Sequence, residues 1–354
     1  MSSESLTYKG YAATSDNWTK FEVKEFEPTA FRDDFVEVKI EYCGICGSDV
    51  HTLTGGWGEV PEPLVAGHEI GGIVHRVGPK VTEFKAGDRV TVGAQSDSCG
   101  KCKMCKSDNE NYCPEQVDTY GAEEKDGKKT MGGYSTSFRC PEKFVFKVPD
   151  NVDLADAAPM ACGGLTAFSP LYRYGVKEGT KLAVVGLGGL GHYATMFGAA
   201  MGAEVTVFSH QADKKEDALK MGAKNFVLTT EDEFAKPYAF TFDIILNTID
   251  VSKAIPVTDL TSMLVVNGRL AIVSMPDDEL PAVKSQDLAA NGATIGVTHV
   301  GSKAEANIMY KLASDKGIKT WKEIIPMKDV SKGVQNVKEN NVRYRYVMEN
   351  DIEA

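Results

Sequence analysis

The chain has 354 residues, 42% of them hydrophobic, and a formal net charge of −11. Its length exceeds that of one typical hydrophobic core, which predicts two domains. The negative charge would repel a phosphate backbone, and no run approaches the roughly eighteen apolar residues of a membrane span, so neither nucleic acid nor membrane is an expected partner.

Short strands with alternating hydrophobic residues fill the first part of the chain. Residues 36–40 and 89–92 are the clearest examples, and Gly-Asp and Gly-Pro pairs mark turns in the same region. A β-rich domain is therefore expected over residues 1–150.

This region also holds residue types that bind zinc. Cys46, His68 and the later Cys162 would supply two thiolates and an imidazole, a set that leaves a fourth position open, as catalytic zinc requires. The alternative is a structural role for each, since a single cysteine such as Cys43 or Cys140 is usually a small buried hydrophobic residue. The combination, rather than any one residue, favours a metal site.

The next segment contains four closely spaced cysteines, Cys99, Cys102, Cys105 and Cys113. Gaps of two, two and seven residues let four thiolates surround one zinc ion at about 2.3 Å. A structural zinc lobe is therefore predicted over residues 95–116. An iron–sulfur cluster is the alternative, because Cys113-Pro114 imitates the end of a ferredoxin motif, although the last gap in that motif is shorter.

Disulfide bonds are a further alternative for these cysteines, and they need an oxidising compartment. Residues 1–7 have neither the basic start nor the apolar stretch of an export signal. A cytoplasmic location with reduced, metal-bound thiols is therefore expected.

A βαβ pattern opens the middle of the chain. Residues 181–185 indicate a buried strand, the run Gly186-Leu187-Gly188-Gly189-Leu190-Gly191 follows, and a helix to about Gly202 precedes a second strand over residues 204–208. In dinucleotide-binding folds the first glycine of this motif permits the turn, the second lets a pyrophosphate approach, and the third packs helix on strand. The motif predicts dinucleotide binding, with a purely structural turn as the alternative.

Four further short apolar segments continue this pattern, at residues 225–228, 242–246, 269–273 and 294–297. They bring the expected number of parallel strands to six, which is typical of a complete dinucleotide-binding fold. The predicted class is α/β, with a doubly wound Rossmann domain over residues 151–298. Residues 299–354 are expected to return to the β-rich domain.

The end of the second strand indicates which cofactor binds. NAD-binding folds usually place a carboxylate there to hold the ribose hydroxyl, whereas this chain has Ser209. Ser209 and Lys214 can donate to a 2′-phosphate, which favours NADP(H), although Asp213 lies between them. The alternative for Lys214 and Lys215 is an ordinary solvated start of a helix.

Several motifs occur together along nearly the whole chain and resemble those of zinc-dependent medium-chain alcohol dehydrogenases, above all the NADP-dependent cinnamyl-alcohol dehydrogenase group. The resemblance implies a GroES-like β-rich catalytic domain, a Rossmann domain, two zinc ions and NADP(H). The motifs are Cys43-Gly-Ile-Cys46-Gly-Ser48-Asp49, Gly67-His68-Glu69, the four-cysteine lobe, Gly132-Gly133-Tyr134, Cys162-Gly-Gly-Leu-Thr166, the glycine run, and Val342-Arg-Tyr-Arg-Tyr346.

The resemblance implies a catalytic zinc held by Cys46, His68 and Cys162, with Glu69 as a neighbour or alternate fourth ligand. Asp49 is expected to accept a hydrogen bond from the second ring nitrogen of His68.

The resemblance also implies that Ser48 and His51 relay a proton, and histidine suits this role because its ordinary pKa is about 6.5. The alternative is a turn serine and a surface imidazole.

For the cofactor, the resemblance implies contacts along the glycine run and at the ends of later strands. The expected residues are Ser48, Thr166, Gly186, Leu187, Gly188, Gly189, Leu190, Gly191, Ser209, His210, Lys214, Thr248, Ser274, Val297, Thr298, His299 and Arg343. For Arg343, an ordinary charged end of a helix or strand is the alternative.

One departure from the family concerns the substrate. Plant lignin-pathway members have a tryptophan shortly after the fourth lobe cysteine, where this chain has residues 116–120 without one. A mostly apolar pocket would accept many hydrophobic aldehydes, so reduction of aromatic and medium-chain aliphatic aldehydes is expected. Its candidate residues are Leu53, Trp57, Tyr120 and His299, and simple packing is the alternative for Trp57.

Three hypotheses for the function follow. The leading one is an NADPH-linked zinc aldehyde reductase, and the second is a reductase of an activated C=C or C=N bond on the same fold. The third is a non-catalytic NADPH-binding protein, which would have no need of an open zinc site. A homodimer joined through residues 269–273 and 294–297 is expected by analogy with the family.

Overall fold

The computed structural model describes residues 7–59 and 62–353, so residues 1–6, on which the expectation about an export signal rests, lie outside the described range. The chain divides into two compact units, residues 1–162 with 301–354, and residues 163–300. The division falls after Cys162 and not after residue 150. The reason is that helix α2 (Leu154–Pro159) packs on strands β3, β4 and β5 of the first unit.

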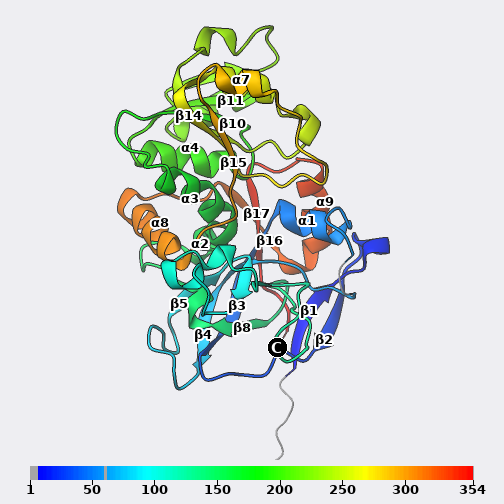
Figure 1. Ribbon diagram of the computed structural model, residues 1–354. Helices are drawn as coiled ribbons and strands as arrows, with labels where there is room; N and C mark the ends of the chain where they lie inside the picture. Colours follow the sequence, from blue (N-terminus) through cyan, green and yellow to red (C-terminus); the bar gives the residue numbers. More distant parts are fainter. Residues whose placement is uncertain (1–6, 60–61, 354) are drawn as a thin grey trace, which may run out of the picture. The chain divides into compact units, whose positions relative to one another are not determined.

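A mixed sheet forms the first unit, with strand order β16-β17-β3-β4-β5-β9 and with β8 paired to β3. Helix α9 contacts α1, β3 and β17. Strands β1 and β2 form a separate pair (Figure 1), and β6 pairs with β7. The strands are β1 (Tyr8–Ala12), β2 (Glu22–Phe26), β3 (Phe35–Ile45), β4 (Glu69–Val77), β5 (Arg89–Val92), β6 (Gln95–Asp97), β7 (Val117–Asp118), β8 (Ser137–Pro141), β9 (Val145–Lys147), β16 (Lys322–Pro326) and β17 (Arg345–Glu349), and the remaining helices are α1 (Gly47–Leu53), α8 (Lys303–Lys316) and α9 (Val330–Lys338).

Strand β3 shows how the alternation of its residues sets the side of the sheet that faces the hydrophobic core. Val36, Val38 and Ile40 alternate along the strand and lie in the hydrophobic core, whereas Lys39 and Glu41 between and after them are exposed. Alternate residues of a strand face opposite sides, so this pattern fixes which face packs inward. The expected β-rich domain is confirmed.

Two buried carboxylates attach the returning C-terminal segment to the rest of the first unit. Oε1 of Glu110, in the zinc lobe, accepts a hydrogen bond of 2.7 Å from the backbone N–H of Lys303, the first residue of α8. Oδ1 of Asp156, in α2, accepts from the N–H of Thr320 at 3.1 Å and forms an ion pair with Lys322. The segment therefore belongs to the first unit through specific buried contacts.

The second unit has a six-stranded parallel sheet of order β12-β11-β10-β13-β14-β15, which confirms the expected doubly wound fold. Helix α4 packs on β10, β11 and helix α3 (Figure 1). Within the described ranges, no helix reaches the length and apolar character needed to cross a bilayer. The strands are β10 (Lys181–Val185), β11 (Glu204–Ser209), β12 (Asn225–Leu228), β13 (Phe242–Asn247), β14 (Leu264–Ile272) and β15 (Thr294–Val297), and the helices are α3 (Leu165–Arg173), α4 (Gly191–Ala200), α5 (Lys215–Lys220), α6 (Val257–Ser262) and α7 (Ser285–Ala289).

Candidate active site

The strand register brings the first two predicted zinc ligands together. Cys46 directly follows β3 and His68 directly precedes β4, and the antiparallel pairing of these strands sets Gly44 opposite Glu69. The end of one strand therefore faces the start of the other.

A π-helical turn, Met160–Gly164, supplies the third ligand from the end of α2. One ligand atom from each of Cys46, His68 and Cys162 lies within 4.8 Å of the others, and Nε2 of His68 is 3.2 Å from Sγ of Cys162. All three residues are buried. Two sulfurs and one imidazole nitrogen at this spacing are a donor set that suits zinc.

The carboxylate of Asp49 positions two of these ligand residues through hydrogen bonds. Its Oδ1 lies 3.0 Å from Nδ1 of His68, as expected, and 3.2 Å from the backbone nitrogen of Gly67. Its Oδ2 accepts from the backbone N–H of Cys46 and from the hydroxyl of Tyr134, each at 2.8 Å. A ring that donates through Nδ1 leaves Nε2 free of a proton for a metal, which is the tautomer a ligand histidine needs.

Electrostatics favour the thiolate form of one ligand. A hydrogen bond from the Cys162 thiol and contacts with His68 lower the pKa of Cys46 well below its ordinary value, against the opposing effect of burial. Zinc binds thiolates and not thiols, so this shift suits a ligand.

Glu69 is also completely buried and forms an ion pair with Arg345. Burial raises the pKa of Glu69 to about 7, and the Arg345 guanidinium opposes this rise. A Cβ at Gly44 would lie 2.0 Å from Oε2 of Glu69, so glycine is needed there to make room for the carboxylate.

The sequence did not reveal the partnerships of Arg345 and Tyr134. Both lie within motifs that carry the family resemblance, and this was the only available signal. Arg345 reaches Glu69, and Tyr134 reaches Asp49, because β3 pairs with β17 and with β8. Spacing along the chain does not reveal this pairing of distant segments.

Helix α1 carries the expected proton-relay residues on its first turns. Oγ of Ser48 lies 3.6 Å from Sγ of Cys46. The ring of His51, three residues later, stacks on Trp57 with centroids 4.9 Å apart and planes 7° from parallel. Ser48 and His51 therefore share one face of the helix.

The residues expected in a substrate pocket have different surroundings. Leu53 and Tyr120 belong to the hydrophobic core, with the Tyr120 ring 5.5 Å from that of His68. Trp57 is 45% exposed, and His299 is half-buried in the second unit. Their role in binding substrate stays a prediction.

The four lobe cysteines lie between the paired strands β6 and β7. Their ligand sulfurs are within 4.8 Å of one another, and Cys102 is 3.5 Å from Cys105 and 3.9 Å from Cys113. Four sulfurs placed tetrahedrally about 2.3 Å from zinc would be ~3.8 Å apart. The lobe thus has the dimensions of a four-thiolate zinc site.

Most of the expected cofactor residues lie at one edge of the parallel sheet. The carboxyl ends of neighbouring strands meet there, which is where ligands bind in open α/β folds. Arg343 and Ser48 belong to the first unit, and Thr166 lies on α3. The residues at the sheet edge are the glycine run after β10, Ser209 and His210 at the end of β11, Thr248 after β13, Ser274 after β14, and Val297 to His299 at the end of β15.

The glycine run has the geometry its motif predicts. Gly186 has a φ of +91°, which favours glycine, and the position of a Cβ at Gly188 has no atom within 4 Å. A Cβ at Gly191 would lie 2.0 Å from the carbonyl oxygen of Gly186, so only glycine lets helix α4 start this close to the turn. The open space at Gly188 fits a pyrophosphate that approaches the backbone.

Lys214 reaches back to the glycine run, where its Nζ donates to the carbonyl of Leu187 at 2.8 Å. Ser209 is buried, and its Oγ accepts from the N–H of Gln211. A lysine ammonium and a serine hydroxyl therefore lie near the turn, without a carboxylate at the end of β11. This environment suits an additional phosphate better than it suits a ribose hydroxyl alone.

Replacing Asp49 by asparagine should loosen the buried metal site. Asp49→Asn removes the charge that orients His68, so zinc affinity at Cys46, His68 and Cys162 should fall about 10- to 100-fold. Zinc retained against a graded chelator measures this, with Asp33→Asn as the control, because Asp33 is 60% exposed in an ion pair with Lys80. Equal retention in both variants would contradict the role of Asp49.

The native chain should bind two zinc ions, one in each cluster. Cys105→Ser should lose the lobe zinc and retain the other, because it removes one of four thiolates. Elemental analysis of dialysed protein counts the ions, and Cys140→Ser is the control, since Cys140 is a buried free cysteine outside both clusters. Two zinc ions in Cys105→Ser protein would show that the lobe thiols are not a metal site.

Comparison with known proteins agrees with this geometry. Residues 32–150 match the alcohol dehydrogenase GroES-like domain, and residues 189–315 match the zinc-binding dehydrogenase domain. The chain is 40% identical over 347 residues to NADP-dependent alcohol dehydrogenase 6 of Saccharomyces cerevisiae, covering 96% of each chain. It is also 40% identical to 8-hydroxygeraniol dehydrogenase of Catharanthus roseus, covering 96% of this chain and 94% of that one.

Two solved structures have the same fold and related sequences. A cinnamyl alcohol dehydrogenase from Sorghum bicolor is 34% identical with a TM-score of 0.93, covering 99% of this chain and all of that one. The CAD of Helicobacter pylori, solved with NADP(H), is 34% identical with a TM-score of 0.89, covering 97% and 98%. The chain therefore belongs to the zinc-dependent medium-chain alcohol dehydrogenases, in the group that includes the cinnamyl-alcohol dehydrogenases.

Proposed function

We propose that this protein is an NADPH-linked, zinc-dependent alcohol dehydrogenase that reduces aromatic and medium-chain aliphatic aldehydes. The observation that carries the proposal is the buried cluster of Cys46, His68 and Cys162, to which the described part of the chain contributes three donors. A structural zinc site usually has four protein ligands, whereas a catalytic one keeps a position for substrate. The 40% identity to an NADP-dependent alcohol dehydrogenase supports the same activity.

The chain's own residues would hold and protonate the substrate. Zinc at the cluster would polarise the aldehyde oxygen as a Lewis acid, and NADPH would supply the hydride. Asp49 keeps His68 in the ligand tautomer, and the Ser48 hydroxyl donates a proton to the developing alcohol oxygen. His51, on the same face of α1, replaces that proton from solvent, since imidazole exchanges protons near neutral pH.

Cinnamaldehyde tests this function against its main alternative, because the molecule has both a C=O and a conjugated C=C bond. We expect zinc-loaded protein with NADPH to yield cinnamyl alcohol, identified by NMR, and to reduce hexanal as well. Cinnamyl alcohol as the product would support aldehyde reduction, and the saturated aldehyde would support a C=C reductase. Binding of NADPH without turnover of either aldehyde would favour a C=N reductase or a non-catalytic protein.

Preference for NADPH should depend on the end of β11. Ser209→Asp places a carboxylate where a 2′-phosphate is proposed to bind, so kcat/KM with NADPH should fall at least about tenfold, or roughly 1.4 kcal/mol. Values of kcat/KM with NADPH and NADH measure the change, and Ser285→Asp on the exposed start of α7 is the matched control. An unchanged ratio in Ser209→Asp protein would assign the phosphate to another part of the unit.

A homodimer is proposed through the edge of the six-stranded sheet. Among the described strands, β15 is at one end of that sheet, so one of its edges is unpaired, and its Val297 is 53% exposed. Pairing of such an edge with a second copy would cover this side chain. Light scattering should give twice the chain mass, and Gly296→Pro should shift it toward the monomer, whereas a monomeric native protein would exclude this assembly.

A cytoplasmic location is also proposed. All eight cysteines are free thiols, and the two metal clusters use six of them. Reduced thiols of this kind persist in a reducing compartment. Fractionation of cells with an antibody against the chain would test the location.

A further inference from the structure

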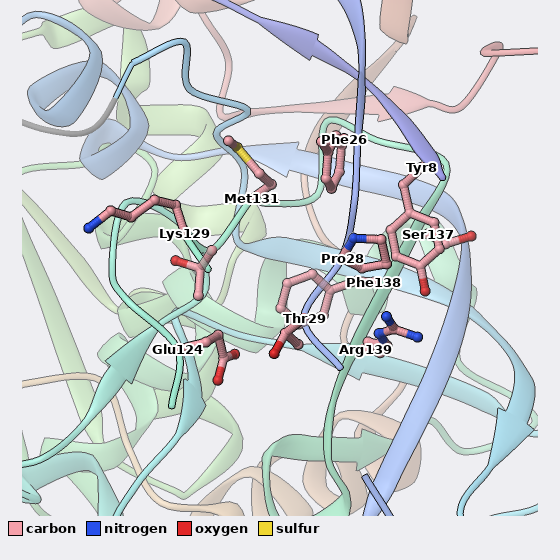
Figure 2. Close-up of a pocket in the computed structure, with 11 residues that line it drawn as sticks. Tyr8, Phe26, Pro28, Thr29, Glu124, Lys129, Met131, Ser137, Phe138 and Arg139 are labelled. Carbon is pink, nitrogen blue, oxygen red and sulfur yellow. The ribbon is translucent and has the colours of Figure 1, made fainter. Parts of the chain in front are cut away.

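A pocket lies in the first unit, and its lining differs from the residues of the candidate active site. It encloses about 350 Å³ when the open solvent at its mouth is included. Phe26, Met131 and Phe138 form part of an apolar wall (Figure 2). None of the predicted zinc, cofactor or substrate residues lines it.

Two charged side chains in the wall of this pocket are nine-tenths or more buried. Glu124 is 6% exposed, and Arg139 on β8 is 8% exposed. Oε2 of Glu124 and Nε of Arg139 have no hydrogen-bond partner among the described residues. Buried polar atoms are nearly always paired, so two unpaired atoms in one pocket wall indicate that something else supplies their partners.

The surroundings of Glu124 leave its charge without a dedicated cation. The nearby carboxylate of Asp97 forms ion pairs with both Arg32 and Lys125, each at 2.8 Å. Burial, and then the charge of Asp97, raise the pKa of Glu124. Oε2 of Glu124 is therefore a buried oxygen that can accept a hydrogen bond from a molecule in the pocket.

Arg139 presents the complementary group. Its Nη1 is paired with the buried carboxylate of Glu37, which also accepts from Arg76 and from the hydroxyl of Tyr8. The guanidinium is thus held in place by one edge, while its Nε–H remains as a donor. Figure 2 shows Glu124 and Arg139 on opposite sides of Phe138, with Phe26 and Met131 across from them.

We propose that this pocket binds a small aromatic molecule with a hydroxyl group at one end and an acceptor oxygen at the other. The hydroxyl donates to Oε2 of Glu124, the acceptor oxygen receives the Nε–H of Arg139, and the ring packs against Phe26 and Phe138. Such a molecule satisfies both buried groups without adding a net charge to the pocket. The site does not depend on the proposed aldehyde reduction.

The test compares three probes of nearly equal size on zinc-loaded protein by isothermal titration and saturation-transfer NMR. 4-Methoxyphenol has both polar groups, 4-methylanisole lacks the hydroxyl, and 4-methylphenol lacks the acceptor oxygen. We expect 4-methoxyphenol to bind at least tenfold more tightly than either of the others. Equal binding of all three would overturn the proposal, as would the absence of saturable binding, which would mean that water alone fills the pocket.

A pair of variants assigns the binding to this pocket. Glu124→Met keeps the side-chain length and removes the acceptor, so the affinity for 4-methoxyphenol should fall at least tenfold. The Tm of the ligand-free variant should be unchanged or higher, because an unpaired buried carboxyl destabilises the fold. Glu323→Met, at an exposed position of the first unit that does not line the pocket, should bind the probe like the native protein. Equal affinity for the probe in both variants would overturn the assignment to this pocket. The comparison of the three probes tests the proposed ligand chemistry in the native protein, without any variant.

Discussion

The buried carboxylate of Asp49 organises the metal-binding end of the first unit. Its two oxygens meet four donors, the backbone N–H groups of Cys46 and Gly67, the Nδ1 of His68 and the hydroxyl of Tyr134. A carboxylate with no exposed surface needs such partners to offset its lost hydration, so the segments that supply them must meet for any of them to be stable. The ligand residues are thus positioned by hydrogen bonds of the protein itself.

Sheet pairing makes this meeting possible. The last residues of β3 face the first residues of β4, and β17 runs along the other side of β3. Arg345, at the start of β17, therefore reaches Glu69 across the sheet, and Gly44 leaves the space that the carboxylate occupies. A one-residue slip in either pairing would turn these side chains to the opposite face and separate the charges.

The sequence predicted what depends on neighbours along the chain. The lobe cysteines and the glycine run each lie within a short segment, where spacing and motif are enough, and the six strands of the second unit have plain apolar patterns. The contact between Glu69 and Arg345, 276 residues apart, was not predicted, because residue type and spacing give no sign of it. Cys162 was placed with Cys46 and His68 by its residue type and by the family resemblance. Helix α2 was assigned to the wrong unit because its apolar sequence suits either one, and only its packing on β3 and β4 decides.

The lobe that holds the four cysteines contains no predicted catalytic group, yet it supports the distant end of the chain. Glu110, on the loop between the third and fourth lobe cysteines, accepts from the first amide of α8. A metal ion that ordered this loop would therefore also position the acceptor of the Lys303 N–H, beside the capping box that Ser302 and Glu305 form at the same end of the helix. Without that ion the start of α8 would lose one of its contacts with the first unit, so increased proteolysis at residues 301–303 would report the metal content of the lobe.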